Sequence, residues 1–235
     1  PGGDARDGIY YEYCRATGTE FFDFKSASFK FGGNYKAFDG ACQAALGNAS
    51  DAAHLYDAIL VDEAQDFAPS FLKLCYSMLK PPKRLVYAYD ELQNLSGNSL
   101  PPPEEIFGND ERGKPLVSFG NDSRRDVILQ KCYRNSRPVL VSAHGLGFGI
   151  YRNAPQGAET GLVQMFDHPA LWLEIGYKVQ SGKLEKGEQV VLQRTKETSP
   201  GFLEEHSDID DLVQFIGFEN QEHHNEWLVQ QILSN

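Results

Sequence analysis

The stretch Ala58-Ile59-Leu60-Val61, followed directly by Asp62-Glu63-Ala64-Gln65-Asp66, decides the fold of this chain. A short apolar run bounded by polar residues is typical of a strand that is buried on both faces of a sheet. Acids at the carboxyl end of such a strand lie in the crevice where open α/β sheets bind their ligands. The stretch therefore predicts a parallel α/β sheet with a functional site at the end of this strand.

The two neighbouring acids suit phosphate chemistry. Asp62 can hold a hydrated Mg²⁺, because this ion prefers one or two carboxylates together with phosphate oxygens. Glu63 can orient or deprotonate the water that attacks a terminal phosphate. Adjacent acids are also common in solvated turns, so the pair indicates nucleotide hydrolysis only together with the segments that follow it.

Three segments, in order along the chain, resemble motifs of the UvrD/Rep-like DNA helicases of superfamily 1. Residues 59–66 resemble the Walker B motif of that family. Residues 84–93, which end in Asp90-Glu91-Leu92-Gln93, are similar to its third motif. Residues 129–136, with Tyr133-Arg134 at their centre, are similar to its fourth motif.

The resemblance covers about residues 50–150 and implies a RecA-like parallel sheet flanked by helices, the fold of P-loop NTPases. Residues 1–127 would form part of a first RecA-like domain, preceded by the tail of a subdomain and carrying a surface loop at residues 94–123. Residues 128–235 would begin a second RecA-like domain. The chain starts at Pro1 without an initiator Met and contains no phosphate loop. It is therefore expected to be an internal fragment, truncated at its N-terminus and inactive alone.

The resemblance also implies a site for ATP and Mg²⁺. Its residues would be the metal ligands Asp62 and Asp90, the catalytic Glu63 and Arg134, and the nucleotide-binding Gln65, Gln93 and Tyr133. Arg134 would act as an arginine finger, because a planar guanidinium suits the charge that spreads over a transferring phosphoryl group. The implied activity couples ATP hydrolysis to movement along single-stranded DNA, or along a duplex with a single-stranded tail.

The third segment departs from the family pattern. The family has Gly before the Asp and an aromatic residue shortly after the Gln, which stacks on a DNA base. Here Tyr89 precedes Asp90, and Asn94-Leu95 follow Gln93. The stacking contact, which contributes about 1–3 kcal/mol per base, is therefore not assigned.

The run Gly108-Asn109-Asp110-Glu111-Arg112-Gly113-Lys114 fits the pattern G-x-x-x-x-G-K but is followed by Pro115. A phosphate loop needs Ser or Thr after the Lys to contact Mg²⁺, and amides that cradle the phosphates. Proline offers neither a hydroxyl nor an N–H group. We therefore do not interpret this run as a phosphate loop.

Composition restricts the class of protein. A hydrophobic fraction of 41% with 15 Phe and 11 Tyr indicates a folded globular chain. No apolar run approaches the roughly 20 residues of a membrane span, so no membrane contact is expected. The net charge of −11 argues against a broad basic surface that coats DNA. The four cysteines form no C-x-x-C pair, which is typical of a reducing compartment and predicts a cytoplasmic location.

Two other functions fit the same residues. A RecA-like module that no longer hydrolyses ATP could act as a protein or DNA scaffold, which the altered third segment and the acidic charge favour. A nuclease could use Asp62, Glu63 and Asp90 around two metal ions. The nuclease would leave Tyr133-Arg134 without a role.

Other patterns predict the elements around the site. Pro69 at a first helical position predicts a helix that Pro81-Pro82 ends, so that strand, helix and strand form a βαβ unit. Gln65 and Asp66 resemble positions that, in the family, link the nucleotide state to strand binding; the alternative prediction is that Asp66 caps this helix. Farther along, the patterns predict two strands and an amphipathic helix, at residues 188–194, 212–218 and 222–233.

Overall fold

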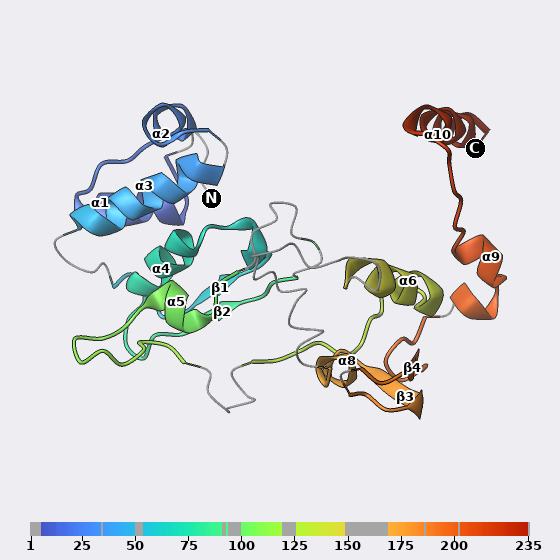
Figure 1. Cartoon of the computed structure of the whole chain (residues 1–235). Helices are drawn as coiled ribbons and strands as arrows, with labels where there is room; N and C mark the ends of the chain where they lie inside the picture. Colours follow the sequence, from blue (N-terminus) through green and yellow to red (C-terminus); the bar gives the residue numbers. More distant parts are fainter. Residues whose placement is uncertain are drawn as a thin grey trace. The chain divides into compact units, whose positions relative to one another are not determined.

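The chain was analysed as a computed structural model, in which the described residues are 6–33, 35–49, 54–90, 93, 100–118, 126–148, 169–185, 187–201 and 203–234. They divide into two compact units, the first ending at Val127 and the second beginning at Ile128 (Figure 1). Within these residues, each unit contains one two-stranded sheet and several helices. None of the described helices combines the length and the apolar composition that a membrane crossing requires.

The first unit packs helices around a parallel strand pair. Its elements are α1 (Ile9–Thr17), α2 (Phe24–Phe31), α3 (Tyr35–Asn48), β1 (Ile59–Val61), η1 (Ala64–Asp66), α4 (Pro69–Ser77), β2 (Leu85–Tyr87) and α5 (Pro103–Phe107). Strands β1 and β2 are parallel, with Leu60 opposite Val86 in the register. Because α4 connects two parallel strands, the predicted βαβ unit is confirmed.

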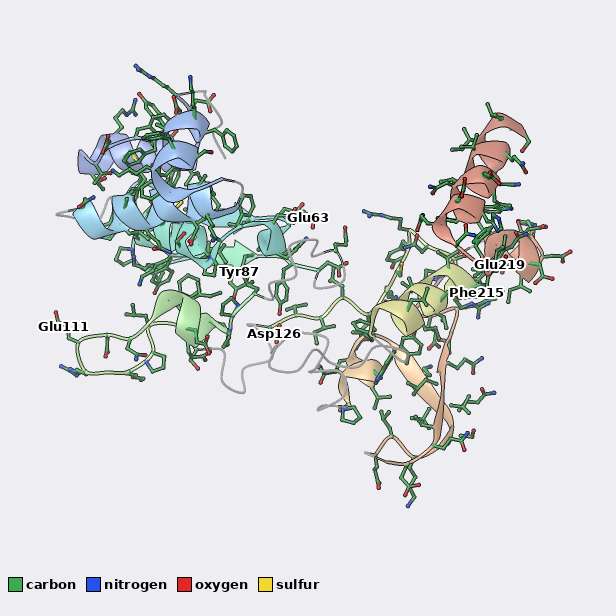
Figure 2. All side chains as sticks on the ribbon, turned by 45° about the horizontal axis from the view of Figure 1, so that its top comes forward. Glu63, Tyr87, Glu111, Asp126, Phe215 and Glu219 are labelled. Atoms are coloured by element: carbon green, nitrogen blue, oxygen red, sulfur yellow. The ribbon has the colours of Figure 1, made fainter. Side chains whose placement is uncertain are left out.

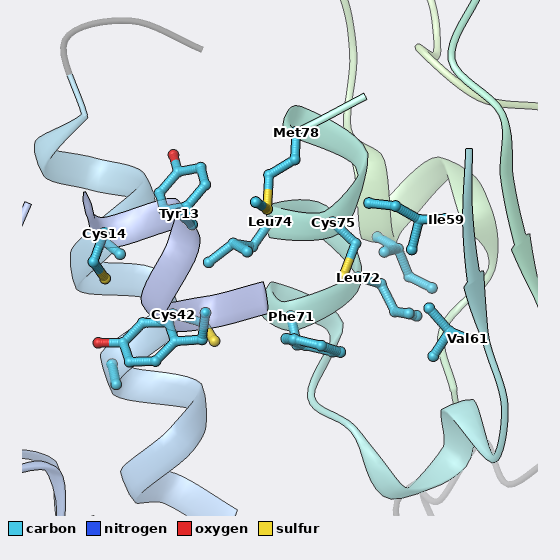
Figure 3. Packing of buried hydrophobic residues seen from close by; sticks show 14 of the residues in the cluster. Tyr13, Cys14, Cys42, Ile59, Val61, Phe71, Leu72, Leu74, Cys75 and Met78 are labelled. Atoms are coloured by element: carbon cyan, nitrogen blue, oxygen red, sulfur yellow. The ribbon is translucent and has the colours of Figure 1, made fainter. Parts of the chain in front are cut away.

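Within the described residues, other elements cover only one face of the sheet. Ile59 and Val61 are buried against α4 (Figure 3), whereas Leu60 is 78% exposed and Val86 is 60% exposed on the opposite face. The expectation that β1 is buried on both faces is therefore wrong for this part of the chain. The observed fold is mixed α/β with a small parallel sheet of two strands.

Helix α4 begins where the sequence predicts. Pro69 lies in its first turn, where a missing N–H group costs nothing because that group has no partner inside the helix. The capping residue is Ala68, so the prediction that Asp66 caps this helix is wrong. Asp66 belongs instead to the 3₁₀ turn η1, and its amide donates to Glu63 O at 3.0 Å.

The core of the first unit lies between α4 and the N-terminal helices. Helix α4 contributes Phe71, Leu72, Leu74 and Cys75 to it, as Figure 3 shows. Burial raises the pKa of the Cys75 thiol to about 12, so this cysteine stays a neutral core residue at physiological pH.

Helix α5 extends this core with residues from a segment that we expected to be a surface loop. We expected a surface loop at residues 94–123, and the structure describes residues 100–118 of this segment. Ile106 and Phe107 of α5 are buried in the core cluster. The surface-loop expectation is therefore wrong for the middle of the segment.

The second unit has an antiparallel sheet. Its elements are α6 (Arg137–Gly147), α8 (Leu171–Glu174), β3 (Tyr177–Gly182), β4 (Val190–Arg194), η3 (Leu203–Glu205), α9 (Ile209–Leu212) and α10 (Gln221–Ser234). Strands β3 and β4 form a hairpin pair with an irregular register between Val179 and Ser181. Strand β4 and helix α10 agree with the sequence predictions. The predicted strand at 212–218 is wrong, because α9 reaches Leu212 and irregular backbone follows.

We expect Leu72→Ala to lower the free energy of unfolding of the first unit by about 2–5 kcal/mol, because it leaves a cavity in a closely packed core. Leu72 has no exposed surface. Urea unfolding followed by circular dichroism measures the change. Its exposed neighbour provides the control, since Lys73→Ala should stay within about 0.5 kcal/mol of the unsubstituted chain. Equal effects of the two substitutions would contradict the packing.

Candidate functional site

The ends of β1 and β2 bring the two predicted acidic segments of the first unit together. Past the strands, Ala88 N donates to Val61 O at 2.9 Å, and Ala64 N donates to Ala88 O at 2.8 Å. The pairing therefore continues beyond the last strand residue on each side. Asp62 and Asp90 leave this pairing at the same edge of the sheet, which is the edge where parallel sheets bind ligands.

Gln65 joins the two segments through its side chain. It is only 6% exposed. Its Oε1 accepts a hydrogen bond from Asp90 N at 3.0 Å, and its Nε2 donates to Glu63 Oε2 at 2.6 Å. Both ends of the amide are thus engaged by protein groups. In this arrangement Gln65 positions Glu63 against the end of β2, and each polar atom of its amide already makes one hydrogen bond within the protein.

Glu63 has an unusual backbone conformation. Its φ of 52° and ψ of 46° lie in the left-handed region, and it is the sole non-glycine residue with positive φ among the described residues. Such conformations cost about 1–3 kcal/mol and concentrate at functional sites. The turn redirects the chain from β1 into η1 and leaves the Glu63 side chain exposed (Figure 2). The strain is therefore located at the residue predicted to be the catalytic base.

Asp62 is placed to approach a hydrated cation. Its Oδ1 accepts a hydrogen bond from Glu63 N at 3.0 Å, and the residue is exposed. Among the described residues, no group of three or more His, Cys, Asp or Glu side chains forms a metal cluster. An exposed carboxylate at a strand end still fits Mg²⁺, because this ion retains several waters and needs only one or two protein carboxylates.

Asp90 and Gln93 form a small unit after β2. Gln93 N donates to Asp90 O at 3.1 Å, and Gln93 Nε2 donates to Asp90 Oδ2 at 2.8 Å. Both residues are exposed. The amide of Gln93 is thus held beside the carboxylate of Asp90. The backbone amide of Asp90 in turn donates to Gln65, so this unit is connected to the β1 segment.

Tyr89 stands where the family pattern has glycine. Its ring packs on Tyr87 with a centroid distance of 6.2 Å. Burial, with smaller contributions from the nearby Tyr89, Asp126 and Glu104, raises the pKa of Tyr87 to about 12. Tyr87 (Figure 2) in turn packs on Phe107 at 6.5 Å. Aromatic rings therefore connect the edge of the site with the core.

The glycine-containing run at residues 108–114 forms a closed turn. Asp110 Oδ1 accepts hydrogen bonds from Arg112 N and Lys114 N, both at 2.9 Å, and Asp110 O accepts one from Gly113 N. Three amides of the run are therefore already bound to Asp110, two to its carboxylate and one to its carbonyl oxygen. This geometry does not fit a phosphate loop.

Tyr133 and Arg134 belong to the second unit, where both are exposed. The backbone just before them is held in place. Cys132 N donates to Thr198 O at 3.0 Å, and Arg194 Nη2 donates to Gln130 O at 2.7 Å. The two residues therefore project from a segment that is attached to the end of β4. The other five predicted site residues, Asp62, Glu63, Gln65, Asp90 and Gln93, lie in the first unit.

Arg194 is the residue that anchors this segment. It is 4% exposed, and its guanidinium donates to Gln130 O, Thr198 O at 2.8 Å, Ile175 O and Ser199 Oγ at 2.8 Å. Its Cζ also lies 5.2 Å from the centre of the Tyr177 ring. Burial lowers the pKa of Arg194, and the carbonyl oxygens satisfy the charge without an acid.

Gly176 allows the backbone of Gln130, in the same segment, to pass close to the start of β3. Its φ is 98°, and a Cβ atom at this position would lie 2.6 Å from Gln130 O. Sequence reasoning gave neither Gly176 nor Arg194 a role. The position of Arg194 in the sequence could have indicated its burial. Side chains alternate along a strand, so Arg194 lies on the same side of β4 as Val190 and Leu192.

No protein-family model matches the chain, and neither a curated protein nor a solved structure matches it.

We expect Gln65→Leu to lower the free energy of unfolding of the first unit by about 1–3 kcal/mol, because it removes two part-buried hydrogen bonds, one from Asp90 N and one to the Glu63 carboxylate, of about 0.5–1.5 kcal/mol each. The Asp90 amide should exchange its hydrogen faster in this variant, which mass spectrometry measures. Gln43→Leu is the control, since Gln43 is exposed and its side chain donates a hydrogen bond to Asp39 of the same helix, on the surface of α3. An unchanged Asp90 amide would refute the bridging role of Gln65.

We expect Arg194→Lys to destabilise the second unit by at least about 1.5–3 kcal/mol, because an ammonium group cannot reach all four acceptors. Thermal unfolding monitored by Trp172 fluorescence measures the loss. Arg134→Lys makes the same chemical change at an exposed position of the same unit and should have little effect on stability. A similar loss in both variants would show that Arg194 is not the anchor.

Proposed function

We propose that this chain is a portion of an ATP-dependent DNA translocase or helicase with RecA-like domains. The observation that supports the proposal most is the joining of two acidic segments at one edge of a parallel sheet. Asp62 and Glu63 follow β1, Asp90 follows β2, and Gln65 hydrogen-bonds to both segments. Sheets of this kind bind nucleotides at that edge.

The proposed roles follow from the geometry of the first unit. Asp62 would hold hydrated Mg²⁺, with Asp90 beside it. Glu63, held by Gln65, would take a proton from the attacking water while the water oxygen bonds to the γ-phosphorus and the bond from that phosphorus to the bridging oxygen breaks, so that ADP leaves. Gln93, fixed against Asp90, would sense the terminal phosphate. When bound, Mg²⁺ would neutralise charge on the phosphate oxygens.

The second unit would supply the remaining contacts of the proposed site. Tyr133 would pack on the adenine ring, and Arg134 would stabilise the charge on the transferring phosphoryl group. Arg194 would act as a positioning residue, because it holds the backbone that carries both side chains. The proposed partner is single-stranded DNA or a duplex with a single-stranded tail, and the proposed location is the cytoplasm.

A scaffold without hydrolysis is the second candidate. The presence of Tyr89 at the position where the family has glycine favours it, as does the net charge of −11. In that case the site would bind nucleotide or DNA without turnover. Measured hydrolysis discriminates between the two proposals.

We expect Glu63→Gln to reduce DNA-stimulated ATP hydrolysis about 10²–10⁴-fold in the protein at its natural length, because the general base is lost. Arg134→Ala should reduce it by about 10³-fold or more. Phosphate release measures both rates. The 235-residue chain alone should show no turnover.

The control for these variants is Glu111→Gln, which removes an exposed acid of the first unit outside the site. Its rate should equal that of the unsubstituted protein. Natural-length protein that binds nucleotide without hydrolysing it would support the scaffold instead. Turnover that survives Glu63→Gln would remove the proposed catalytic role.

A further inference from the structure

Helix α10 carries an apolar stripe that the described residues leave uncovered. Within Gln221–Ser234 no side chain is buried. Leu228, Val229, Ile232 and Leu233 are all exposed, and their spacing of three and four residues puts them on one face of the helix. Next to the stripe, Phe218 packs on His224 and Trp227, with ring centroids 5.1 Å and 5.5 Å away.

A helix of this length needs packing to be stable. Isolated helices shorter than about 12–15 residues are marginal in water, and most helical stability in proteins comes from packing of an apolar face. The polar face of α10 includes Gln230, so only the stripe offers such a face. A surface in contact with the stripe is therefore required if α10 is to remain folded.

The same unit has an open groove whose lining, like the stripe, is largely apolar. It lies between α6, β4 and α9 and has a volume of about 440 Å³. Its apolar lining consists of Pro138, Val141, Leu192, Ile209 and Leu212. Ile209 is mostly exposed, so apolar surface in the groove faces solvent just as the stripe does.

The charged residues in the lining of the groove are bonded to other protein groups. Arg137 pairs with Glu204 through two side-chain contacts, and Glu204 Oε1 also accepts from Arg137 N. Burial raises the pKa of Glu204, but the Arg137 partners lower it more, so the acid remains charged and paired. Arg194, which also lines the groove, donates to carbonyl oxygens and to Ser199 Oγ, and the acids Asp208 and Asp211 lie at the edge of the groove beside Glu204.

The connection between groove and helix is short. Leu212 lines the groove, and Val213–Asn220 lead directly to α10 (Figure 2 labels Phe215 and Glu219 in this segment). Eight extended residues span up to about 26 Å, so α10 is tethered close to the groove that Leu212 lines. A tether of this length also gives an effective concentration in the millimolar range, far above that of a second copy in dilute solution.

We propose that α10 is a strap that closes over the groove between α6, β4 and α9 of its own chain. The stripe Leu228, Val229, Ile232 and Leu233 then packs on Val141 and Ile209, in the manner of an amphipathic helix in an apolar groove. This closure buries two apolar surfaces that are otherwise exposed. It also covers the Arg137–Glu204 pair at the start of α6, directly after the Tyr133-Arg134 segment.

Hydrogen exchange of the whole 235-residue chain, followed by mass spectrometry, tests the proposal. The reference is a synthetic peptide of residues 219–235. We expect the α10 amides to exchange about 100-fold more slowly in the chain than in the peptide. Exchange at the peptide's rate would refute the docking. Protection that rises with protein concentration would show that a second copy, and not the same chain, supplies the contact.

Matched substitutions locate the contact. Val141→Asp in the groove should reduce the protection of α10 at least tenfold. Val179→Asp should not, although Val141 and Val179 are both 41% exposed in the same unit. Equal loss in both variants would overturn the proposal.

A second pair of substitutions on α10 itself covers the case in which Val141→Asp unfolds the unit. Ile232→Asp changes the stripe, and Gln230→Asp changes the opposite side of the helix. Only Ile232→Asp should abolish the protection of α10, while β3 and β4 stay protected in both variants. Unchanged protection in Ile232→Asp would refute the contact.

Discussion

The parallel pairing of β1 with β2 is the constraint on which the candidate site depends. Two acidic segments about 25 residues apart in the sequence meet because Val61 and Ala88 continue the strand pairing past its last residues. Gln65 then fixes this arrangement, since its buried amide bonds to Glu63 on one side and to Asp90 N on the other. Without the pairing, Asp62 and Asp90 would be unrelated surface acids.

A buried polar side chain plays the corresponding part in each unit. Gln65 is neutral and joins two strand ends, whereas Arg194 is charged and joins β4 to the backbone before Tyr133. In both cases the exposed residues with proposed chemical roles make few structural contacts themselves. Their positions are fixed by a buried neighbour, whose own hydrogen-bonding groups are bonded to other groups of the protein. Loss of that neighbour leaves buried groups unpaired, which is costly.

Local patterns in the sequence predicted the βαβ unit, the start of α4 at Pro69, strand β4 and helix α10, because these depend on periodicity and on the residues at helix ends. They failed where distant contacts decide. Ile106 and Phe107 lie in a Pro-rich segment, yet they are buried because α4 offers them a surface. The run ending at Phe218 is rich in apolar and aromatic residues, which are common in strands, but within the described part of the chain it pairs with no strand. The positions of Asp62, Glu63 and Asp90 were predictable, whereas the link through Gln65 depends on a side-chain conformation that no pattern encodes.

The exposed face of the sheet and the candidate metal ligand are parts of the same surface. Side chains alternate along a strand, so Ala58, Leu60 and Asp62 lie on one side of β1, and the first two are exposed there. Parallel sheets are normally covered on both faces, because their strands offer apolar residues to both. An element that packs on Leu60 and Val86 would therefore cover the side of β1 on which Asp62 also lies, and would change the solvent exposure of that carboxylate.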